Sequence, residues 1–426
     1  MTPWLARTLF VVSLAVSGNA HATVLSEDEF EGSSTSLGAV WRSFGFTLAG
    51  PVLAPPYAPL DLSPTVVGIF DTRLYFERKT SRYQFVVHPQ LTLRGFSHEV
   101  GGIASFGRGP SPPRWLPLSY DFVDESTVKL RGSIDRLYLS YTLGPATVIV
   151  GRQAVTFGRG KLWRTSDVVS TFSLTEVDTE YKPGSDALRI DINFGESRDL
   201  TIVAAAGEIE SKEHDAEVTV QGSTALARYQ HGGAIGEIGA MAGMVRGDVF
   251  VSLDGTLDLG SFDIYGEASV THPTSNSLGT PTAADSPIVK GLLGATFKPG
   301  AKVTFTPEFM YSGFGAWRSE DYLQALSSER VAIGEQTTIG RVYAGLATQV
   351  ELDPLWNLVT AQIVNLHDPS GLFSLALQHN LANNASVLVG AYAPMGKLPE
   401  SGFIPLPQSE FGSYPYFVFT ELKGVL

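Results

Sequence analysis

The sequence contains no cysteine, and this absence removes several classes of protein at once. A disulfide framework, a thiolate metal site, a cysteine nucleophile and a lipidated N-terminal cysteine all need that residue. A chain without thiols also suits passage through an oxidising compartment such as the bacterial periplasm, where a stray thiol is a liability.

Long apolar runs and positive charge are scarce as well. After residue 22, no stretch approaches the roughly 18 consecutive apolar residues of a membrane-spanning helix, which excludes a helical membrane protein. Charged residues make up only 17% of the chain and the net charge is −13, which argues against nucleic-acid binding by a general basic surface.

Motifs of the common enzyme families are missing. The sequence has no Gly-x-Ser-x-Gly, no His-Glu-x-x-His, no P-loop and no Rossmann glycine fingerprint. Its histidines are scattered, and the pairs His214-Asp215 and His367-Asp368 fall in expected loops, where a solvated polar pair is the simpler interpretation. We therefore expect no enzyme activity, metal or cofactor, although a Ser-His-acid site assembled from distant strands would leave no motif.

The first 22 residues have the features of a secretory signal peptide. Arg7 gives a positive start, Leu9 to Val16 an apolar core, and Ala20-His21-Ala22 a small-x-small cleavage site. The apolar run is too short to cross ~30 Å of hydrocarbon as an anchor. We expect cleavage after Ala22, which leaves 426 − 22 = 404 residues.

Apolar and polar residues alternate through the rest of the chain. Between Arg82 and Arg94 the odd positions are mostly apolar or aromatic and the even positions mostly polar, and the same period recurs in 188–194 and 302–311. Successive side chains of a strand point to opposite faces of its sheet, so each segment has one apolar and one polar face. The pattern predicts an all-β protein.

The connections between these segments alternate in length. Short links such as 79–81 and 298–300 follow every other strand, and mostly longer connections such as 98–126 and 158–184 lie between them. This alternation is typical of outer-membrane β-barrels, and it gives about 18 strands, with 16 as the alternative count. The expected strands cover residues 38–48, 66–78, 82–97, 127–142, 146–157, 185–195, 198–210, 221–231, 235–246, 248–258, 261–271, 287–297, 301–312, 339–350, 356–366, 371–380, 384–393 and 412–424.

A sheet with one apolar face can span a bilayer only when it closes on itself. Lipid offers no partner for backbone N–H and C=O groups, so the first strand must pair with the last. We predict a transmembrane antiparallel up-and-down β-barrel over residues 38–426, after a short acidic periplasmic segment over 23–37. A soluble β-sandwich is the alternative; aromatic residues near many strand ends, which can form interfacial girdles, favour the membrane barrel.

Two stretches resemble parts of known outer-membrane proteins. Residues 413–422 resemble the C-terminal strand that such proteins present to the barrel-insertion machinery, although this chain ends Gly424-Val425-Leu426 rather than in Phe. The stretch Val150-Gly151-Arg152-Gln153, with Phe157-Gly158 and 186–189, looks like one in monomeric porins of the alginate-export type. The whole layout is similar to that of large porins, which implies outer-membrane lipids and the insertion machinery as partners; a monomer and a trimer fit equally well.

A barrel of this size leaves an aqueous channel, so charged residues on the polar strand faces should line water. Basic residues gather on the earlier strands and acidic residues on the later ones. Because consecutive strands are neighbours, we predict an arginine-rich wall facing a carboxylate-rich wall, whose transverse field would orient dipolar solutes. The alternative is that these charges only keep the pore wet. The predicted basic lining is Arg73, Arg82, Arg94, Arg131, Arg136, Arg152, Arg189 and Arg228, and the acidic lining is Asp254, Asp258, Asp263, Glu267, Glu308 and Glu351.

The connection over 158–184 carries a cluster of basic residues and a tryptophan. We predict that this loop folds inward and narrows the pore; the alternative is a surface loop without pore contact. Its candidate constriction residues are Arg159, Lys161, Trp163, Arg164 and Asp167.

These features together predict a porin that lets small polar or anionic solutes diffuse across the outer membrane. Two alternatives stay open: an export channel for an acidic polysaccharide, and a barrel with an occluded lumen that acts in structure, adhesion or lipid modification.

Overall fold

The structure is a computed structural model that describes residues 23–28, 32–54, 58–98, 112–170, 181–208, 217–275, 277, 287–400 and 406–426. The signal peptide expected over 1–22 lies outside these residues, as does the pair His214-Asp215.

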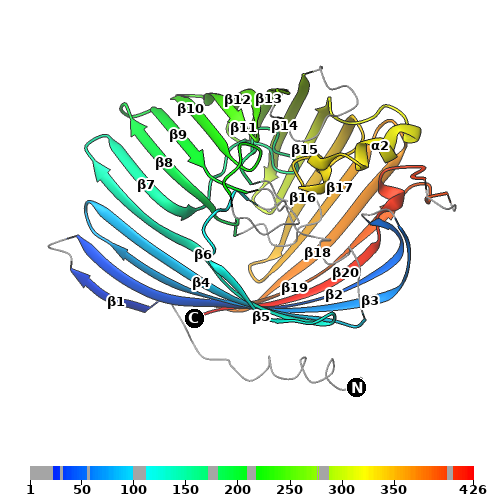
Figure 1. Ribbon diagram of the computed structural model, residues 1–426, viewed down its shortest axis with the longest axis horizontal. Coiled ribbons are helices and arrows are strands. Elements are labelled where there is room, and N and C mark those ends of the chain that lie inside the picture. Colours follow the sequence, from blue (N-terminus) through cyan, green and yellow to red (C-terminus); the bar gives the residue numbers. More distant parts are fainter. Residues whose placement is uncertain are drawn as a thin grey trace.

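Eighteen strands form one closed antiparallel β-barrel (Figure 1). Each strand pairs with the next one along the chain, and β2 pairs with β20 from Val40 opposite Val425 to Ala49 opposite Tyr416, which closes the barrel. The strands are β2 (Ser33–Ala54), β3 (Ala58–Lys79), β4 (Tyr83–Phe96), β6 (Val128–Leu143), β7 (Ala146–Gln153), β8 (Ser185–Asn193), β9 (Arg198–Ala205), β10 (Thr224–Gly233), β11 (Gly236–Val245), β12 (Asp248–Asp258), β13 (Phe262–His272), β14 (Ile288–Gly300), β15 (Val303–Ser312), β16 (Val342–Asp353), β17 (Trp356–Asn365), β18 (Ser370–Ala382), β19 (Ala385–Met395) and β20 (Tyr416–Val425). The prediction of a closed barrel of about 18 strands is confirmed.

Two further strands extend the wall locally. β1 (Thr23–Asp28) pairs with the first residues of β2, so the segment expected before the barrel, 23–37, contains a strand and the start of β2. β5 (Ser119–Asp124) pairs with residues 129–133 of β6, on the side where β7 pairs only with residues 137–143. β5 therefore takes the place along β6 that β7 would occupy if β7 were longer.

The two faces of each strand meet different surroundings. On β12, the side chains of Val249, Val251 and Leu253 point outward, and Leu253 is 61% exposed, whereas the alternating Phe250 is 1% exposed inside the barrel. Exposed large hydrophobic side chains recur in this way on β3, β6, β14 and β19. An outer surface with this apolar character fits the hydrocarbon of a bilayer, so the barrel is a membrane-spanning one.

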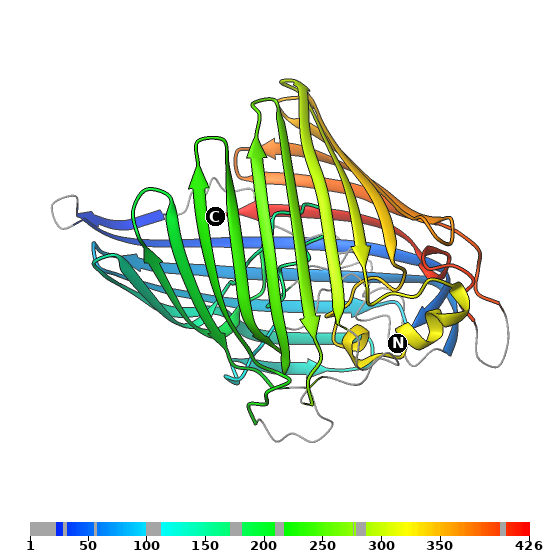
Figure 2. The ribbon, with the colours of Figure 1, turned by 90° about the horizontal axis from the view of Figure 1, so that it is seen from above.

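The two ends of the barrel differ. Connections such as 80–82, 259–261 and 301–302 are tight turns, and we call their side the short-turn end. The opposite, long-loop end carries the connection from β15 to β16, with η3 (Ser319–Asp321), α2 (Tyr322–Leu326) and α3 (Glu329–Ala332), and the connection from β19 to β20, with η4 (Phe411–Ser413). Figure 2 shows green hairpins at one end and the yellow helices at the other.

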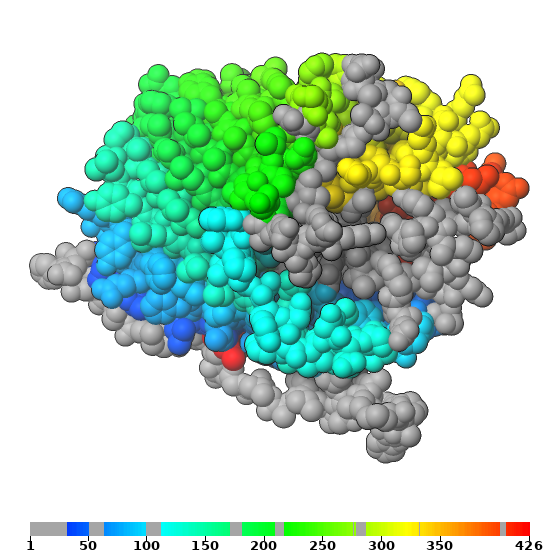
Figure 3. Space-filling view, in the orientation of Figure 1, coloured from blue at the N-terminus to red at the C-terminus, as the bar shows by residue number. Residues whose placement is uncertain are grey.

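The helices are short connectors. Across the described ranges, no helix has both the length and the apolar character needed to cross a membrane. In Figure 3, the yellow loop with α2 and the cyan segment around β5 lie on opposite sides of one face.

Candidate functional site

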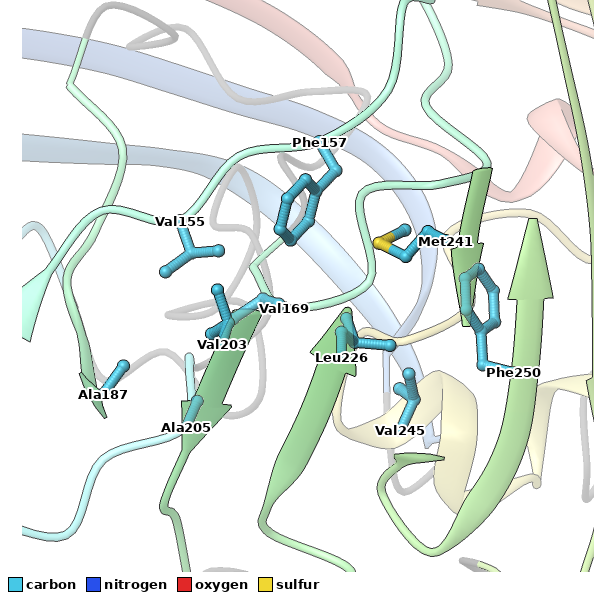
Figure 4. Close-up of a cluster of buried hydrophobic side chains, with 10 residues drawn as sticks. All are labelled: Val155, Phe157, Val169, Ala187, Val203, Ala205, Leu226, Met241, Val245 and Phe250. Atoms are coloured by element: carbon cyan, nitrogen blue, oxygen red, sulfur yellow. The ribbon is translucent and has the colours of Figure 1, made fainter. Parts of the chain in front are cut away.

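The chain leaves the barrel wall after β7 and enters the interior. The connection to β8, which we call the inward loop, is described over 154–170 and 181–184. Val155, Phe157 and Val169 of this loop pack on inward side chains of the wall, as Figure 4 shows. Those wall residues are Ala187, Val203, Ala205, Leu226, Met241, Val245 and Phe250. The loop is therefore part of the packed interior of the barrel rather than a surface excursion.

Two carboxylates on the inner wall hold the tip of the inward loop. Glu267 of β13 accepts hydrogen bonds from the backbone N–H groups of Arg159, Gly160 (2.7 Å) and Ser166 (2.9 Å) and from the Thr165 hydroxyl (3.0 Å). Such charge-assisted bonds are stronger than those between neutral groups. Unpaired N–H groups would be costly in this buried position, so Glu267 fixes the path of the tip.

Glu308 of β15 also holds the tip of the inward loop. Its carboxylate accepts the backbone N–H groups of Lys161 (2.5 Å), Leu162 (3.0 Å) and Trp163 (3.1 Å), and also the Tyr265 hydroxyl (2.7 Å). Residues 159–166 therefore wrap around two carboxylates on neighbouring parts of the wall.

Glycines make this close approach feasible. A Cβ on Gly160 would lie 1.7 Å from the carbonyl oxygen of Trp163, and Gly158 has a φ of +88°, which L side chains rarely adopt. On the wall, a Cβ on Gly345 would lie 2.5 Å from Leu162 and 2.9 Å from Trp163. The indole of Trp163 occupies the space that this glycine leaves.

Arg159 is paired rather than free in the pore. Its guanidinium lies 2.6 Å from Glu237 of β11 and 2.9 Å from Asp254 of β12. Asp254 also lies 2.8 Å from Arg228 of β10, in space left open by Gly239. Two predicted lining residues, Arg228 and Asp254, are thus joined to a predicted constriction residue in one ion-pair network.

A buried ion pair joins the two arms of the inward loop. Lys182 Nζ lies 2.6 Å and 2.5 Å from the two carboxylate oxygens of Asp167, and the Asp167 side chain is inaccessible to solvent. Burial raises the pKa of Asp167 and lowers the pKa of Lys182. Arg164 is half-buried and lies 3.9 Å from the same carboxylate. Lys161 is exposed toward the interior cavity that is described below.

Arg152 lies in a joint of the wall instead of lining open water. Its guanidinium lies 2.7 Å from Asp186 and donates hydrogen bonds to the carbonyl oxygens of Ile134 (3.0 Å) and Leu116 (2.7 Å). Asp186 also accepts the backbone N–H groups of Trp115 (2.8 Å) and Leu116 (2.7 Å). Arg152 is only 1% exposed, because it fills the gap that opens where β7 leaves the sheet.

Arginines on β3, β4 and β6 face the interior from the wall opposite these anchors. The Arg73 guanidinium lies 3.5 Å from the ring centroid of Tyr181, a residue of the inward loop, and Arg136 lies 4.4 Å from it. Arg94 is half-buried on the same face of β4 as Gln90 and Thr92, which donate hydrogen bonds to Asp71. This basic wall is partly capped by the end of the loop.

Most of the other predicted lining residues lie near the barrel ends, whereas Arg189 is in the middle of β8. Arg131 is exposed and lies 3.7 Å from Asp121 of β5, and Arg189 lies 2.9 Å from Asp191 on its own strand. Arg82 is in the turn between β3 and β4. At the same short-turn end, Asp258 is opposite Asp263 in register and Glu351 donates its backbone N–H to the Lys302 carbonyl.

A cavity of about 310 Å³ lies between the inward loop and the wall, toward the long-loop end. Its lining includes Lys161, Trp163, Arg164 and Asp167 from the loop, which are among the predicted constriction residues. It also includes Arg246 of the turn between β11 and β12 and Lys290 of β14, which are not among the predicted site residues. In the described part of the chain, no three Asp, Glu or His side chains are grouped as a metal site requires.

Another buried carboxylate, Glu410, lies among the loops at the long-loop end. Glu410 accepts hydrogen bonds from the Tyr343 hydroxyl (2.6 Å), the Asn365 amide (2.9 Å) and the backbone N–H of Ile339 (3.0 Å). Burial raises the pKa of Glu410 to about 7 against the opposing effect of these bonds. Sequence reasoning missed Glu410 and Lys182, because a single acid or base in a connection carries no periodic signal. It also missed Glu237, which is the second residue of β11, next to a turn.

Comparison with known proteins gives fold relatives but no sequence relatives. No family model matches the chain, and no curated protein does. The outer membrane protein OprD of Pseudomonas aeruginosa aligns with a TM-score of 0.57 at 10% identity over 96% of this chain and 95% of its own. Acinetobacter baumannii OccAB4 aligns with a TM-score of 0.56 at 8% identity over 92% and 98%.

A third neighbour, Pseudomonas aeruginosa OccK2 solved in complex with glucuronate, aligns with a TM-score of 0.54 at 8% identity over 92% and 96%. The suggested resemblance to alginate-export porins is not supported. The residues that suggested it include Gly151, Arg152 and Asp186, which form the joint between β7 and the inward loop. Their similarity therefore reflects the local geometry of the wall. The chain has the fold of the OprD-type outer-membrane porins.

Proposed function

We propose that this protein is an outer-membrane porin through which small polar solutes diffuse passively, with a preference for anions. One observation carries the proposal: the inward loop covers the carboxylates of β12, β13 and β15, while Arg73 of β3 and Arg94 of β4 face the interior from the other side. Arg136 of β6 is paired with Asp135 and adds no net charge. A solute that passes the loop then meets more uncompensated positive than negative charge, and such a field favours anions.

The neighbours are consistent with this proposal. OprD is an outer membrane protein by name, and OccK2 was solved with the anionic sugar glucuronate. We extend the location to this chain, together with the cleavage of residues 1–22 after Ala22 and delivery by the barrel-insertion machinery. We also infer that the long-loop end faces outward and that residues 23–37 begin on the periplasmic side.

Single-channel recording tests the proposal directly. The mature protein, purified from outer membranes and inserted in a planar bilayer, should give discrete conductance steps. With a KCl gradient, the reversal potential should show chloride to be more permeant than potassium. A protein that inserts but does not conduct would instead be an occluded barrel, and a cation-selective current would contradict the anion preference.

A further inference from the structure

Charged side chains are divided between the two faces of β9 at the short-turn end of the barrel. Val203 is 1% exposed inside the barrel, whereas Ile202 is on the outer surface and 38% exposed. Successive side chains of a strand alternate between the faces, so Asp199 is on the inner face and Arg198, the first residue of β9, is on the outer face. A cation therefore lies on the outside of the wall where β9 begins.

The neighbouring strand β10 places a second basic group beside Arg198 (Figure 1). Leu226 is buried inside the barrel and Tyr229 is exposed on its outside, so His231 is on the outer face as well. His231 is directly opposite Arg198 in the register. The Cβ atoms of such a pair lie about 4.5–5.5 Å apart, and Tyr229 is the diagonal neighbour of Arg198, within reach of long side chains. We call Arg198, His231 and Tyr229 the rim cluster.

No acid of the described residues balances the rim cluster. No carboxylate oxygen in that part of the chain, including those of Glu196 and Asp199, lies within 4.0 Å of Arg198 or His231. The Arg198 guanidinium donates one hydrogen bond, to the carbonyl oxygen of Phe194 (3.4 Å), and has five N–H groups in all. Two groups that can both be positively charged repel each other across a strand pair, so an anion from outside the barrel stabilises them.

The outer surface next to the rim cluster, toward the middle of the membrane, is apolar. Ala227 of β10 and Ala240 and Ala242 of β11 are exposed there. The register places these small side chains between the larger Ile202 of β9 and Leu253 of β12. An extended hydrocarbon chain can lie along such a strip in close contact with the wall. The surface as a whole therefore suits a molecule with an anionic head and an apolar chain.

We propose that the rim cluster binds the phosphate of an anionic phospholipid in the inner leaflet of the outer membrane. The Arg198 guanidinium pairs with the phosphate, since its N–H groups match two phosphate oxygens at once. His231 and the Tyr229 hydroxyl donate to the same headgroup, and one acyl chain lies along the strip that contains Ala227. The inference goes beyond the proposed porin function and takes from it only the outer-membrane location and the periplasmic position of the short-turn end.

Native mass spectrometry of the full mature protein in detergent, titrated with lipid, tests the ligand class. Dioleoylphosphatidylglycerol, which is anionic, should bind at least about tenfold more tightly than dioleoylphosphatidylcholine, which has the same chains and phosphate but no net charge. Glycerol 3-phosphate, which has no chains, should not displace the bound lipid at an equal concentration. Equal binding of the two lipids would overturn the recognition of charge, and displacement by glycerol 3-phosphate would overturn the role of the apolar strip.

Matched variants test the residues. Arg198→Gln should weaken the binding of dioleoylphosphatidylglycerol about tenfold, and Arg198→Lys, which keeps the charge but loses the planar fork, should retain part of it. Lys302→Gln removes a positive charge from another exposed turn at the same end of the barrel and should leave binding unchanged. Circular dichroism checks that each variant is folded. Unchanged binding in Arg198→Gln, or equal weakening in Arg198→Gln and Lys302→Gln, would leave only a general attraction of the surface for anionic lipid and would overturn the site.

The two proposals fail in different ways. Conductance without a preference for the anionic lipid overturns the lipid site and leaves the porin in place. Lipid preference without conductance overturns the porin function and leaves the lipid site.

Discussion

Glu267 accepts four hydrogen bonds from the inward loop, one more than Glu308 accepts from it. Three of these four donors are backbone N–H groups, for which the described residues offer no other acceptor. A glutamine at this position keeps the size but replaces one acceptor oxygen by an amide N–H₂, which faces donors. Glu267→Gln should therefore loosen the loop, at a cost of about 1–3 kcal/mol.

The expected result is a higher or noisier single-channel conductance and a lower thermal unfolding midpoint. Glu351→Gln is the matched control, because Glu351 is an inward acid near the short-turn end that does not hold the loop. If both variants conduct like the parent protein, the loop tip does not limit the current.

Glu410 should make the stability of the protein depend on pH. Its pKa in the folded protein is about 7, above the ordinary value of 4.5, so the folded state holds a proton over this interval that the unfolded state has lost. Its contribution to stability is present below pH 4.5 and is lost as the pH rises to about 7. The total is about 3 kcal/mol, at 1.36 kcal/mol for each pH unit.

Thermal unfolding between pH 4.5 and 8, followed by circular dichroism, tests this expectation. The midpoint of the parent protein should fall across this range relative to that of Glu410→Gln, which mimics the neutral carboxyl. A constant difference between the two proteins would mean that Glu410 does not change its ionisation there.

At the scale of elements, the ion pair between Asp167 and Lys182 joins the two arms of the inward loop. Removal of Lys182 leaves the buried Asp167 carboxylate with only the more distant Arg164, 3.9 Å away, and removal of one partner of a buried pair commonly costs about 3–5 kcal/mol. Removal of both partners leaves no buried charge of the pair behind. Lys182→Met should therefore damage the loop more than the double variant Asp167→Asn, Lys182→Met does.

Limited proteolysis and the noise of single-channel currents can measure how much each variant loosens the loop. We expect Lys182→Met to be cleaved faster within the loop than the parent protein, with partial recovery in the double variant. Additive effects of the two substitutions would contradict direct coupling between the side chains.

The strands themselves could be predicted because their signal is local. Each of the eighteen expected strands overlaps one strand of the barrel, and the expected range 248–258 coincides with β12. β7 was expected to reach residue 157 but ends at Gln153, because Arg152 and Asp186 bind the joint where the chain turns inward. β5 was missed, since it is six residues long and its pairing with β6 depends on the absence of β7 there.

The roles of the inward acids could not be predicted in the same way. Alternation puts Glu267 and Glu308 on the polar face of their strands, but their partners are backbone groups of a loop more than 100 residues away in sequence. A side chain that faces an open lumen and one that holds a loop have the same local pattern. Only the path of the inward loop distinguishes them.

At the scale of the whole molecule, the net charge of the chain and the proposed charge of the pore lining have opposite signs. The chain carries −13, yet its central carboxylates are engaged by the loop and by arginines, while Arg73 and Arg94 face the interior. Ion selectivity depends on the charges near the ion path and within about one Debye length, ~10 Å at 0.1 M salt. The selectivity should therefore follow these arginines rather than the overall charge.

Charge reversal at matched positions tests this dependence. Arg94→Glu changes the field inside the barrel by two charges and should lower the chloride-to-potassium permeability ratio several-fold at 0.1 M KCl, with a smaller effect at 1 M, where the Debye length is ~3 Å. Arg82→Glu makes the same change in a turn at the barrel rim and should alter the ratio much less. Arg152→Glu should instead reduce the yield of folded barrel, because Arg152 is sealed in the wall against Asp186. If Arg82→Glu and Arg94→Glu shift the reversal potential equally, the selectivity arises at the pore mouth, and the basic wall inside does not set it.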